Sequence, residues 1–183
     1  MISWGLVVFA GSLFVARKNV SSGLRFLAMC IGSLGDMTLA HFGVFENYPF
    51  VLGAGFFALA HIFYIFAYTS RTEKVFNKGF FIGMRIGISF IVLLLPVYFL
   101  SPHNDFLCLV LIYGFVIGFL LSVVFAYNYD KKSLVSKLNA VGIISFAVSD
   151  FLIGINIVGG IDFACRGDLV WLFYPIGQFL LII

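Results

Sequence analysis

Charged residues are scarce in this sequence. Lysine, arginine, aspartate and glutamate together make up 10% of its 183 residues, whereas soluble domains contain about a quarter. Hydrophobic residues make up 62%, and the mean hydropathy is +1.13. These values exclude a soluble globular domain and indicate a polytopic integral membrane protein. The net charge of +3 comes from basic residues between apolar stretches and gives no reason to expect a nucleic-acid partner.

Cysteine is also rare, and the sequence has no clear targeting signal. Cys30, Cys108 and Cys165 are odd in number and scattered, so they suggest neither a disulfide framework nor a metal site. We interpret them as small hydrophobic residues. The first apolar stretch lacks a basic segment before it and a clear small-residue cleavage site after it. We therefore expect a retained helix there, not a signal peptide.

Seven apolar stretches approach or exceed the roughly 20 helical residues that cross a bilayer. We predict an all-α bundle of seven transmembrane helices in a single domain, residues 1–183. Because the first and last stretches are short, an eighth helix stays open as an alternative. The predicted spans are residues 2–16, 23–44, 50–69, 79–100, 105–127, 136–158 and 168–183.

Basic residues between these spans are distributed unevenly. The first, third and fifth connections carry eight lysines and arginines, the second and fourth carry none, and the sixth carries only Arg166. The positive-inside rule then places the N-terminus outside and the C-terminus in the cytoplasm. We expect an integral protein of the bacterial inner membrane in this orientation.

Two aspartates lie alone within apolar spans, Asp36 in the second and Asp150 in the sixth. A charged side chain at the helix centre costs about 2.5–3.5 kcal/mol on the insertion scale, so an intramembrane carboxylate indicates a functional site. Each aspartate is about eight residues from the outer end of its predicted span. We therefore expect both carboxyl groups at one level, near the bilayer centre or slightly outward.

Polar residues of other spans fall at a similar depth. His61 and Tyr64 lie one turn apart in the third span, Tyr113 lies in the fifth, and Tyr174 and Gln178 lie one turn apart in the seventh. We expect these side chains to converge with the aspartates on one intramembrane pocket, where they would orient substrate or water.

A short internal similarity links the two aspartates. A small residue precedes each one, in Gly35-Asp36 and in Ser149-Asp150, and polar residues follow about 25 positions later in the next span. The first three spans and the last three could therefore be parallel halves that the fourth span joins.

The segments around these residues resemble successive blocks of the YhhN, or lysoplasmalogenase-like, membrane family. That pattern has a Gly-Asp in an early helix, a His-x-x-Tyr in the next, a Ser-Asp in a late helix and a Tyr…Gln in the last. The matching segments are SLGDMTLA, GFFALAHIFYIFAY, AVGIISFAVSDFLIG and WLFYPIGQFLLII, and the similarity runs from about residue 24 to the end. Two features depart from the pattern: family members have eight helices, and here Pro175 follows Tyr174, where it could kink the helix.

The resemblance implies hydrolysis of the vinyl-ether bond of lysoplasmalogens to a fatty aldehyde and a glycerophospho-headgroup. The expected partners are the lysophospholipid substrate and membrane lipids, and we expect no metal or organic cofactor. Vinyl ethers hydrolyse by slow proton transfer to carbon, and water then captures the oxocarbenium ion. Burial and a nearby second carboxylate both favour the neutral form of a carboxyl group. Asp36 and Asp150 are therefore the predicted catalytic pair, one acid and one base.

Three other interpretations stay open. The aspartates could serve only as interhelical hydrogen-bond partners, or they could form a proton relay in a small transporter. A zinc-dependent lipid hydrolase would need several histidine ligands, and the sequence has only His41, His61 and His103. A retinal protein is excluded, because residues 168–183 contain no lysine.

Overall fold

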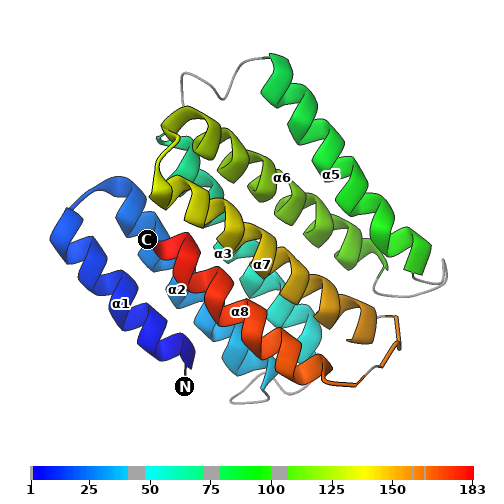
Figure 1. Cartoon of the computed structure of the whole chain (residues 1–183). Helices are drawn as coiled ribbons and strands as arrows, with labels where there is room; N and C mark the ends of the chain where they lie inside the picture. Colours follow the sequence, from blue (N-terminus) through cyan, green and yellow to red (C-terminus); the bar gives the residue numbers. More distant parts are fainter. Residues whose placement is uncertain (1, 41–47, 72–78, 100–106, 158, 163) are drawn as a thin grey trace.

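The computed structural model describes residues 2–183 except 41–47, 72–78, 100–106, 158 and 163. These described residues form seven α-helices and no strand (Figure 1), which confirms the all-α prediction. The helices are α1 (Ile2–Arg17), α2 (Val20–Leu39), α3 (Pro49–Thr69), α5 (Gly79–Phe99), α6 (Leu107–Lys131), α7 (Leu134–Ile157) and α8 (Arg166–Ile182).

Each predicted span corresponds to one helix, with ends that differ by a few residues. The second span, predicted as 23–44, begins at Val20, because the Asn19 side chain accepts a hydrogen bond from the Ser22 N–H at 2.9 Å and caps α2. Its described part ends at Leu39, and the apolar residues after it extended the hydropathy signal. Residues 41–44 lie outside the described residues.

Three described segments are long and apolar enough to cross a membrane by themselves, namely Pro49–Thr69, Cys108–Lys131 and Leu134–Asn156. The prediction of a membrane protein is supported, but seven membrane-spanning helices are not shown. Two helices are too short to be counted as spans. α1 has 16 residues, and α8 has 17 and contains the charged Arg166 and Asp168.

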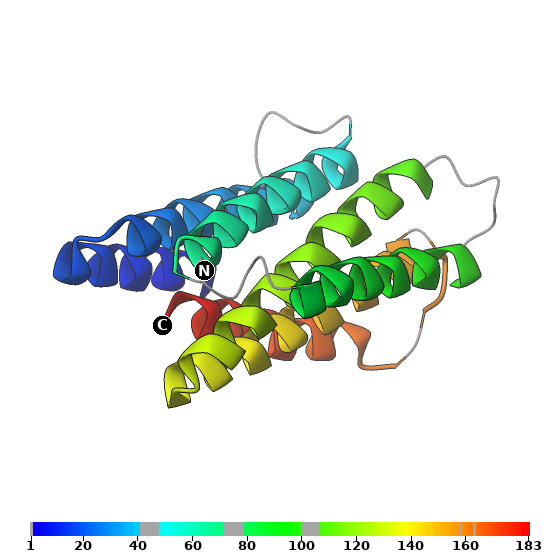
Figure 2. The same ribbon diagram turned by 90° about the horizontal axis from the view of Figure 1, so that it is seen from above.

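The helices pack as two similar sets of three. In the first set α1 contacts α2 and α2 contacts α3; in the second α6 contacts α7 and α7 contacts α8. The sets are joined by α3 against α6 and by α1 against α8, while α5 lies at the edge of the bundle against α6 (Figures 1 and 2). Each contact in one set has a counterpart in the other. This arrangement agrees with the hypothesis of parallel halves, related by an axis along the membrane normal.

Glycines allow close approach within each set. A Cβ on Gly177 of α8 would lie 2.8 Å from the Phe146 nitrogen and 3.0 Å from the Gly142 oxygen of α7. A Cβ on Gly35 of α2 would lie 3.3 Å from the Gly53 oxygen of α3. Small residues at such contacts let membrane helices pack backbone to backbone, so both helix pairs that carry the aspartates are held tightly.

The end of α8 is fixed by side chains from four other helices. The last carbonyls of a helix have no partner within it. Here Asn139, Tyr68, Arg25 and Arg17 donate hydrogen bonds to the carbonyl oxygens of residues 180, 181, 182 and 183, respectively. These bonds fix the position of α8, which carries Tyr174 and Gln178.

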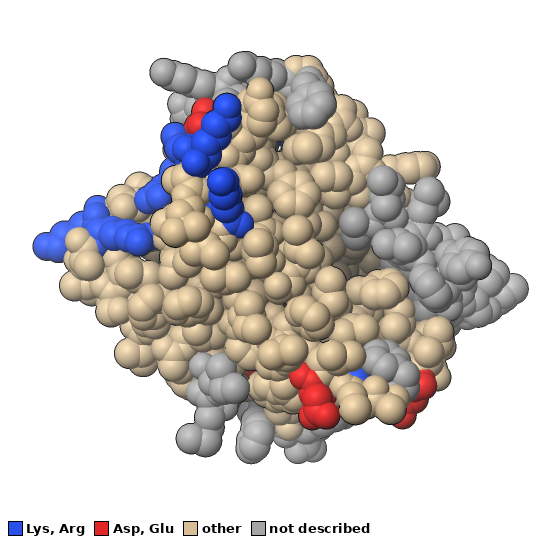
Figure 3. All heavy atoms as spheres, viewed as in Figure 1, with Lys and Arg blue, Asp and Glu red and all other residues tan. Residues whose placement is uncertain are grey.

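Basic residues gather at one end of the bundle (Figure 3). They lie where α1 and α6 end and where α7 begins, and include Arg17, Lys18, Lys131, Lys132 and Lys137. Asp162 lies between α7 and α8, and Arg166 and Asp168 lie in the first turn of α8, at the opposite end of the bundle. Arg166 is 3.3 Å from Asp162. The orientation of the bundle across the membrane stays a prediction, and Lys74 and Lys78 lie outside the described residues. We call the end that holds the lysines the basic end and the opposite end the outer end, a name that refers only to position in the bundle.

Candidate active site

Asp36 accepts hydrogen bonds from two hydroxyl groups. Ser3 of α1 donates one, and Tyr174 of α8 donates the other at 2.9 Å. Three helices therefore meet at this carboxyl group, which lies three residues before the end of α2 rather than the expected eight. Sequence analysis did not identify Ser3, because one hydroxyl in an apolar helix carries little signal.

Asp150 of α7 is also the meeting point of three helices. The Tyr113 hydroxyl of α6 donates a hydrogen bond to its Oδ2 atom, and the His61 Nε2 atom of α3 lies 3.8 Å from the same oxygen. That separation exceeds a hydrogen bond. Neither ring nitrogen of His61 has a hydrogen-bond partner in the described part of the chain, although the side chain is buried. His61 is therefore buried beside the carboxyl group, with neither ring nitrogen hydrogen-bonded to a described residue.

The surroundings of the two aspartates correspond across the two sets of helices. Each carboxyl group accepts a hydrogen bond from a hydroxyl on the first helix of its own set. The donor is Ser3 for Asp36 and Tyr113 for Asp150. Each also faces a side chain from the third helix of the other set, which is Tyr174 or His61. The halves are thus joined crosswise at the site.

Tyr64 and Gln178 form a separate link between the halves. The Tyr64 hydroxyl donates to Gln178 Oε1 at 2.8 Å, and both side chains are buried between α3 and α8. Neither residue hydrogen-bonds to an aspartate among the described residues. The pair was predicted to orient substrate, and no described contact with an aspartate supports that role.

Aromatic rings pack against the side chains that contact the two aspartates. Phe146 contacts His61 at 4.9 Å and Tyr174 at 5.5 Å between ring centroids, and Tyr113 lies edge-on to His61 at 5.5 Å. Phe57 lies edge-on to Tyr174 at 6.0 Å. These contacts restrict the orientation of the polar side chains and leave little room for bulk water.

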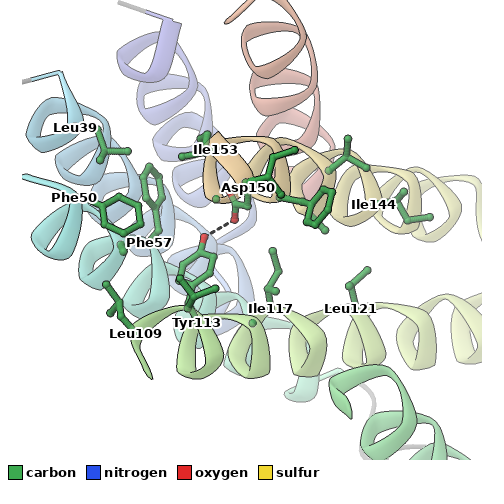
Figure 4. A pocket seen from close by; sticks show the side chains of 18 residues that line it. Leu39, Phe50, Phe57, Leu109, Tyr113, Ile117, Leu121, Ile144, Asp150 and Ile153 are labelled. Atoms are coloured by element: carbon green, nitrogen blue, oxygen red, sulfur yellow. Dashed lines mark hydrogen bonds between the residues drawn. The ribbon is translucent and has the colours of Figure 1, made fainter. Parts of the chain in front are cut away.

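A cavity of about 380 Å³ lies between α3, α6 and α7, with Leu39 of α2 at one side (Figure 4). Its described lining is apolar apart from two side chains, Tyr113 and Asp150, whose hydrogen bond lies in its wall. The volume is in the range of small-molecule sites, roughly 300–1,000 Å³. The cavity therefore presents one carboxyl group to an apolar ligand.

The expectation that all the predicted residues line one pocket is wrong. Tyr113 and Asp150 line the cavity, whereas the other predicted site residues do not: Asp36, His61, Tyr64, Tyr174 and Gln178. The cause is the aromatic packing, since Phe57 lines the cavity and stands between it and Tyr174. Hydropathy places residues at a depth, but it does not show which large side chains separate them.

No three His, Cys, Asp or Glu side chains are grouped as metal ligands among the described residues. Two of the histidines that the zinc hypothesis invokes, His41 and His103, lie outside the described residues.

Comparison with known proteins gives one result at the level of the family. The sequence matches the YhhN family over residues 2–183, essentially its whole length, and this range includes both aspartates and every residue bonded to them. Neither the search of curated proteins nor that of solved structures finds a match. The chain therefore belongs to the YhhN family, as the sequence motifs predicted.

Proposed function

We propose that this protein hydrolyses the vinyl-ether bond of lysoplasmalogens within the membrane, with Asp150 as the acid. The observation that carries the proposal is the Asp150 carboxyl group in the wall of an otherwise apolar cavity. Membership of the YhhN family, which is associated with lysoplasmalogenase-type hydrolases, supports the same reaction class.

The reaction needs a carboxylic acid beside a carbon–carbon double bond. The acid transfers its proton to the second carbon of the alkenyl chain, which leaves an oxocarbenium ion between the first carbon and the ether oxygen. Water adds to the first carbon and returns a proton to the carboxylate. The hemiacetal then breaks its carbon–oxygen bond to the glycerol, giving a fatty aldehyde and a free hydroxyl group on the headgroup. A similar ion forms in glycosidases, which also use paired carboxyl groups.

The neighbouring side chains suit supporting roles in this scheme. Tyr113 holds Asp150 by its hydrogen bond, and His61 has ring nitrogens available to orient the attacking water. Asp36, held by Ser3 and Tyr174, supplies a second negative charge from outside the cavity when it is ionised. Fixed charges in a site that excludes water stabilise such an ion more than they would in solution.

The test is an assay of purified protein in detergent with three substrates of equal chain length. The alkenyl ether should be cleaved with release of free aldehyde, whereas the saturated ether and the ester should stay intact. In deuterated water the rate should fall severalfold, because a proton reaches carbon in the slow step. Ester cleavage at a comparable rate would instead identify a general lysophospholipase.

A proton-relay transporter is the second candidate, and one observation favours it. Partly or fully buried polar side chains run from Asp36 and Tyr174 through the Tyr64–Gln178 pair to Arg25, which donates to the Ile182 carbonyl oxygen near the basic end. In proteoliposomes a transporter would release an imposed proton gradient when its solute is added, and Gln178→Leu would stop that release. Aldehyde formation without any proton flux would reject this candidate.

A further inference from the structure

We propose that the cavity binds the hydrocarbon chain of a single-chain lipid in one orientation. The chain end lies toward Leu121 and Ile144, and the headgroup emerges between the outer ends of α3 and α6, beside Phe50 and Leu109. The identity of the lipid as a lysoplasmalogen rests on the proposed function, but the orientation of the chain does not depend on the reaction.

The size of the cavity fits one chain. It extends along α6 from Leu109 to Leu121, twelve residues apart, and this distance is about 18 Å at roughly 1.5 Å per residue. A cavity of about 150 Å³ holds the six carbons of benzene. On that scale the 380 Å³ observed here corresponds to about 15 carbon atoms in all, which one chain and its glycerol unit would share, and it leaves no room for a second chain.

The cavity has an apolar opening on the surface of the bundle. Ile144, Val148 and Phe151 of α7 line it and are 48%, 37% and 37% exposed, respectively. These residues follow one another at intervals of three and four, so they lie along one face of the helix. In a membrane this face contacts lipid tails, and a hydrocarbon chain can therefore enter sideways without crossing water.

The inner end of the cavity is closed and apolar. Beyond Leu121, α6 and α7 pack through Val124, Tyr127, Ala140 and Ile143, which belong to one buried core. A phosphate placed there would lose its hydration without gaining a polar partner among the described lining residues, and such a loss costs many kcal/mol. The outer end lies where α3 and α6 begin, so a headgroup placed there reaches the aqueous surface by the shortest route.

The position of Asp150 agrees with this orientation. Its partner Tyr113 is four residues from Leu109 and eight from Leu121, or about 6 Å from the outer end and 12 Å from the inner end. With the ether oxygen beside Asp150, the glycerol unit occupies the short outer part and the chain fills the longer inner part. A second acyl chain on the glycerol would have no place. If the basic end faces the cytoplasm, the bound lipid belongs to the opposite leaflet.

The orientation can be tested on the unmodified chain with photoreactive lipids. Two saturated-ether lysophospholipids would carry a diazirine either at the chain end or next to the ether oxygen, and mass spectrometry would map the crosslinks. The chain-end probe should label residues near Leu121 and Ile144, and the other probe should label residues near Tyr113 and Phe57. Excess unlabelled lipid should remove both signals. The reverse pattern, or labelling that resists competition, would overturn the proposal.

Matched tryptophan variants provide a second measurement. Leu121 lines the inner end of the cavity and is 9% exposed, whereas Ile112 lies on the same helix, outside the cavity, and is 58% exposed. Leu121→Trp should weaken binding of a hexadecyl-ether lysolipid at least tenfold and that of an octyl-ether analogue, whose chain ends before Leu121, less than threefold, while Ile112→Trp should change neither more than twofold. Equal losses for both chain lengths would contradict the proposed orientation.

These probes cannot be hydrolysed at a vinyl ether, so they report on the site independently of catalysis. Correct crosslinks together with no cleavage of an alkenyl ether would reject the proposed reaction and retain the chain site. Cleavage together with reversed crosslinks would retain the reaction and reject the orientation.

Discussion

Asp36 and Asp150 occupy equivalent places in the two halves of the bundle, but their surroundings differ. Asp36 accepts hydrogen bonds from Ser3 and Tyr174 and lies away from the cavity. Asp150 accepts one from Tyr113, lies 3.8 Å from His61 and forms part of the cavity wall. A symmetric framework therefore holds two carboxyl groups in unequal environments.

This difference suggests how a duplicated arrangement can divide two roles. Under the proposed function, the half whose carboxyl group accepts two hydrogen bonds provides a supporting charge, and the half that borders the cavity provides the acid that meets substrate. The contacts between the halves make each site depend on both of them. Tyr174 and His61 each come from the half opposite to the aspartate that they face. The predictions below test whether the two halves differ as the geometry indicates.

The largest effect is expected at Asp150. Asp150→Asn keeps the size of the side chain and its hydrogen bonding but removes the acidic proton, so kcat should fall by about 10²–10⁴, the usual contribution of a general acid. Asp36→Asn should lower kcat only about tenfold, because it removes a supporting charge. Aldehyde release by purified variants measures both. Asp168→Asn, at an exposed position, is the control. Equal losses at Asp36 and Asp150 would show that the two roles are not divided in this way.

A smaller effect on stability should separate the two helix pairs. Gly177→Ala places a methyl group 2.8 Å from backbone of α7, so we expect a loss of about 1–3 kcal/mol from overpacking. Gly35→Ala first meets the Phe57 ring at 3.1 Å, which has more freedom to move, and should cost less. Gly55→Ala meets nothing within 4 Å and should be neutral or slightly stabilising. Thermal unfolding in detergent measures all three, and a Gly177→Ala protein as stable as Gly55→Ala would show that the close contact is unimportant.

Removing the tyrosine hydroxyls should also lower activity more on the Asp150 side than on the Asp36 side, but by smaller factors than replacing the aspartates. Tyr113→Phe removes the hydrogen bond to the carboxyl group in the cavity wall, and loss of a bond to a group that becomes charged costs about 1.5–3 kcal/mol. We expect kcat/KM to fall about tenfold or more. Tyr174→Phe leaves Asp36 with the Ser3 hydroxyl, so the fall should be nearer threefold. A larger loss for Tyr174→Phe would reverse the assignment of the two aspartates.

Much of the fold was predictable because hydrophobic length is a strong local signal. The seven helices appear close to the predicted spans, with shifts at ends where capping or polar residues decide, such as Asn19 before α2. The two aspartates were identifiable for the same reason, since a carboxyl group in an apolar helix is conspicuous. The parallel halves were suggested by only two short matches, and the helix contacts agree with them.

The organisation of the site was less predictable, because it depends on packing between helices far apart in sequence. Depth alone put His61, Tyr174 and Gln178 in the same pocket as Asp150, but none of the three lines the cavity. Two rings that do line it, Tyr113 and Phe57, pack edge-on against His61 and Tyr174, respectively. The contribution of Ser3 could not be inferred either, because its partner lies 33 residues away on another helix.

The smallest expected effect concerns Ser3, which occupies in its half the place that Tyr113 has in the other. Ser3→Ala should lower kcat/KM no more than about threefold and change the unfolding free energy by less than about 1 kcal/mol, because Tyr174 still donates to Asp36. Ser12→Ala is the control, since the exposed Ser12 bonds only to a carbonyl of its own helix among the described residues.

A double-mutant cycle sharpens the comparison. Ser3→Ala and Tyr174→Phe share Asp36 and should be non-additive, whereas Ser3→Ala and Tyr113→Phe should add within about 0.5 kcal/mol. Strong coupling between Ser3 and Tyr113 would mean that the two carboxyl groups act as one unit, and the comparison between the halves would then fail.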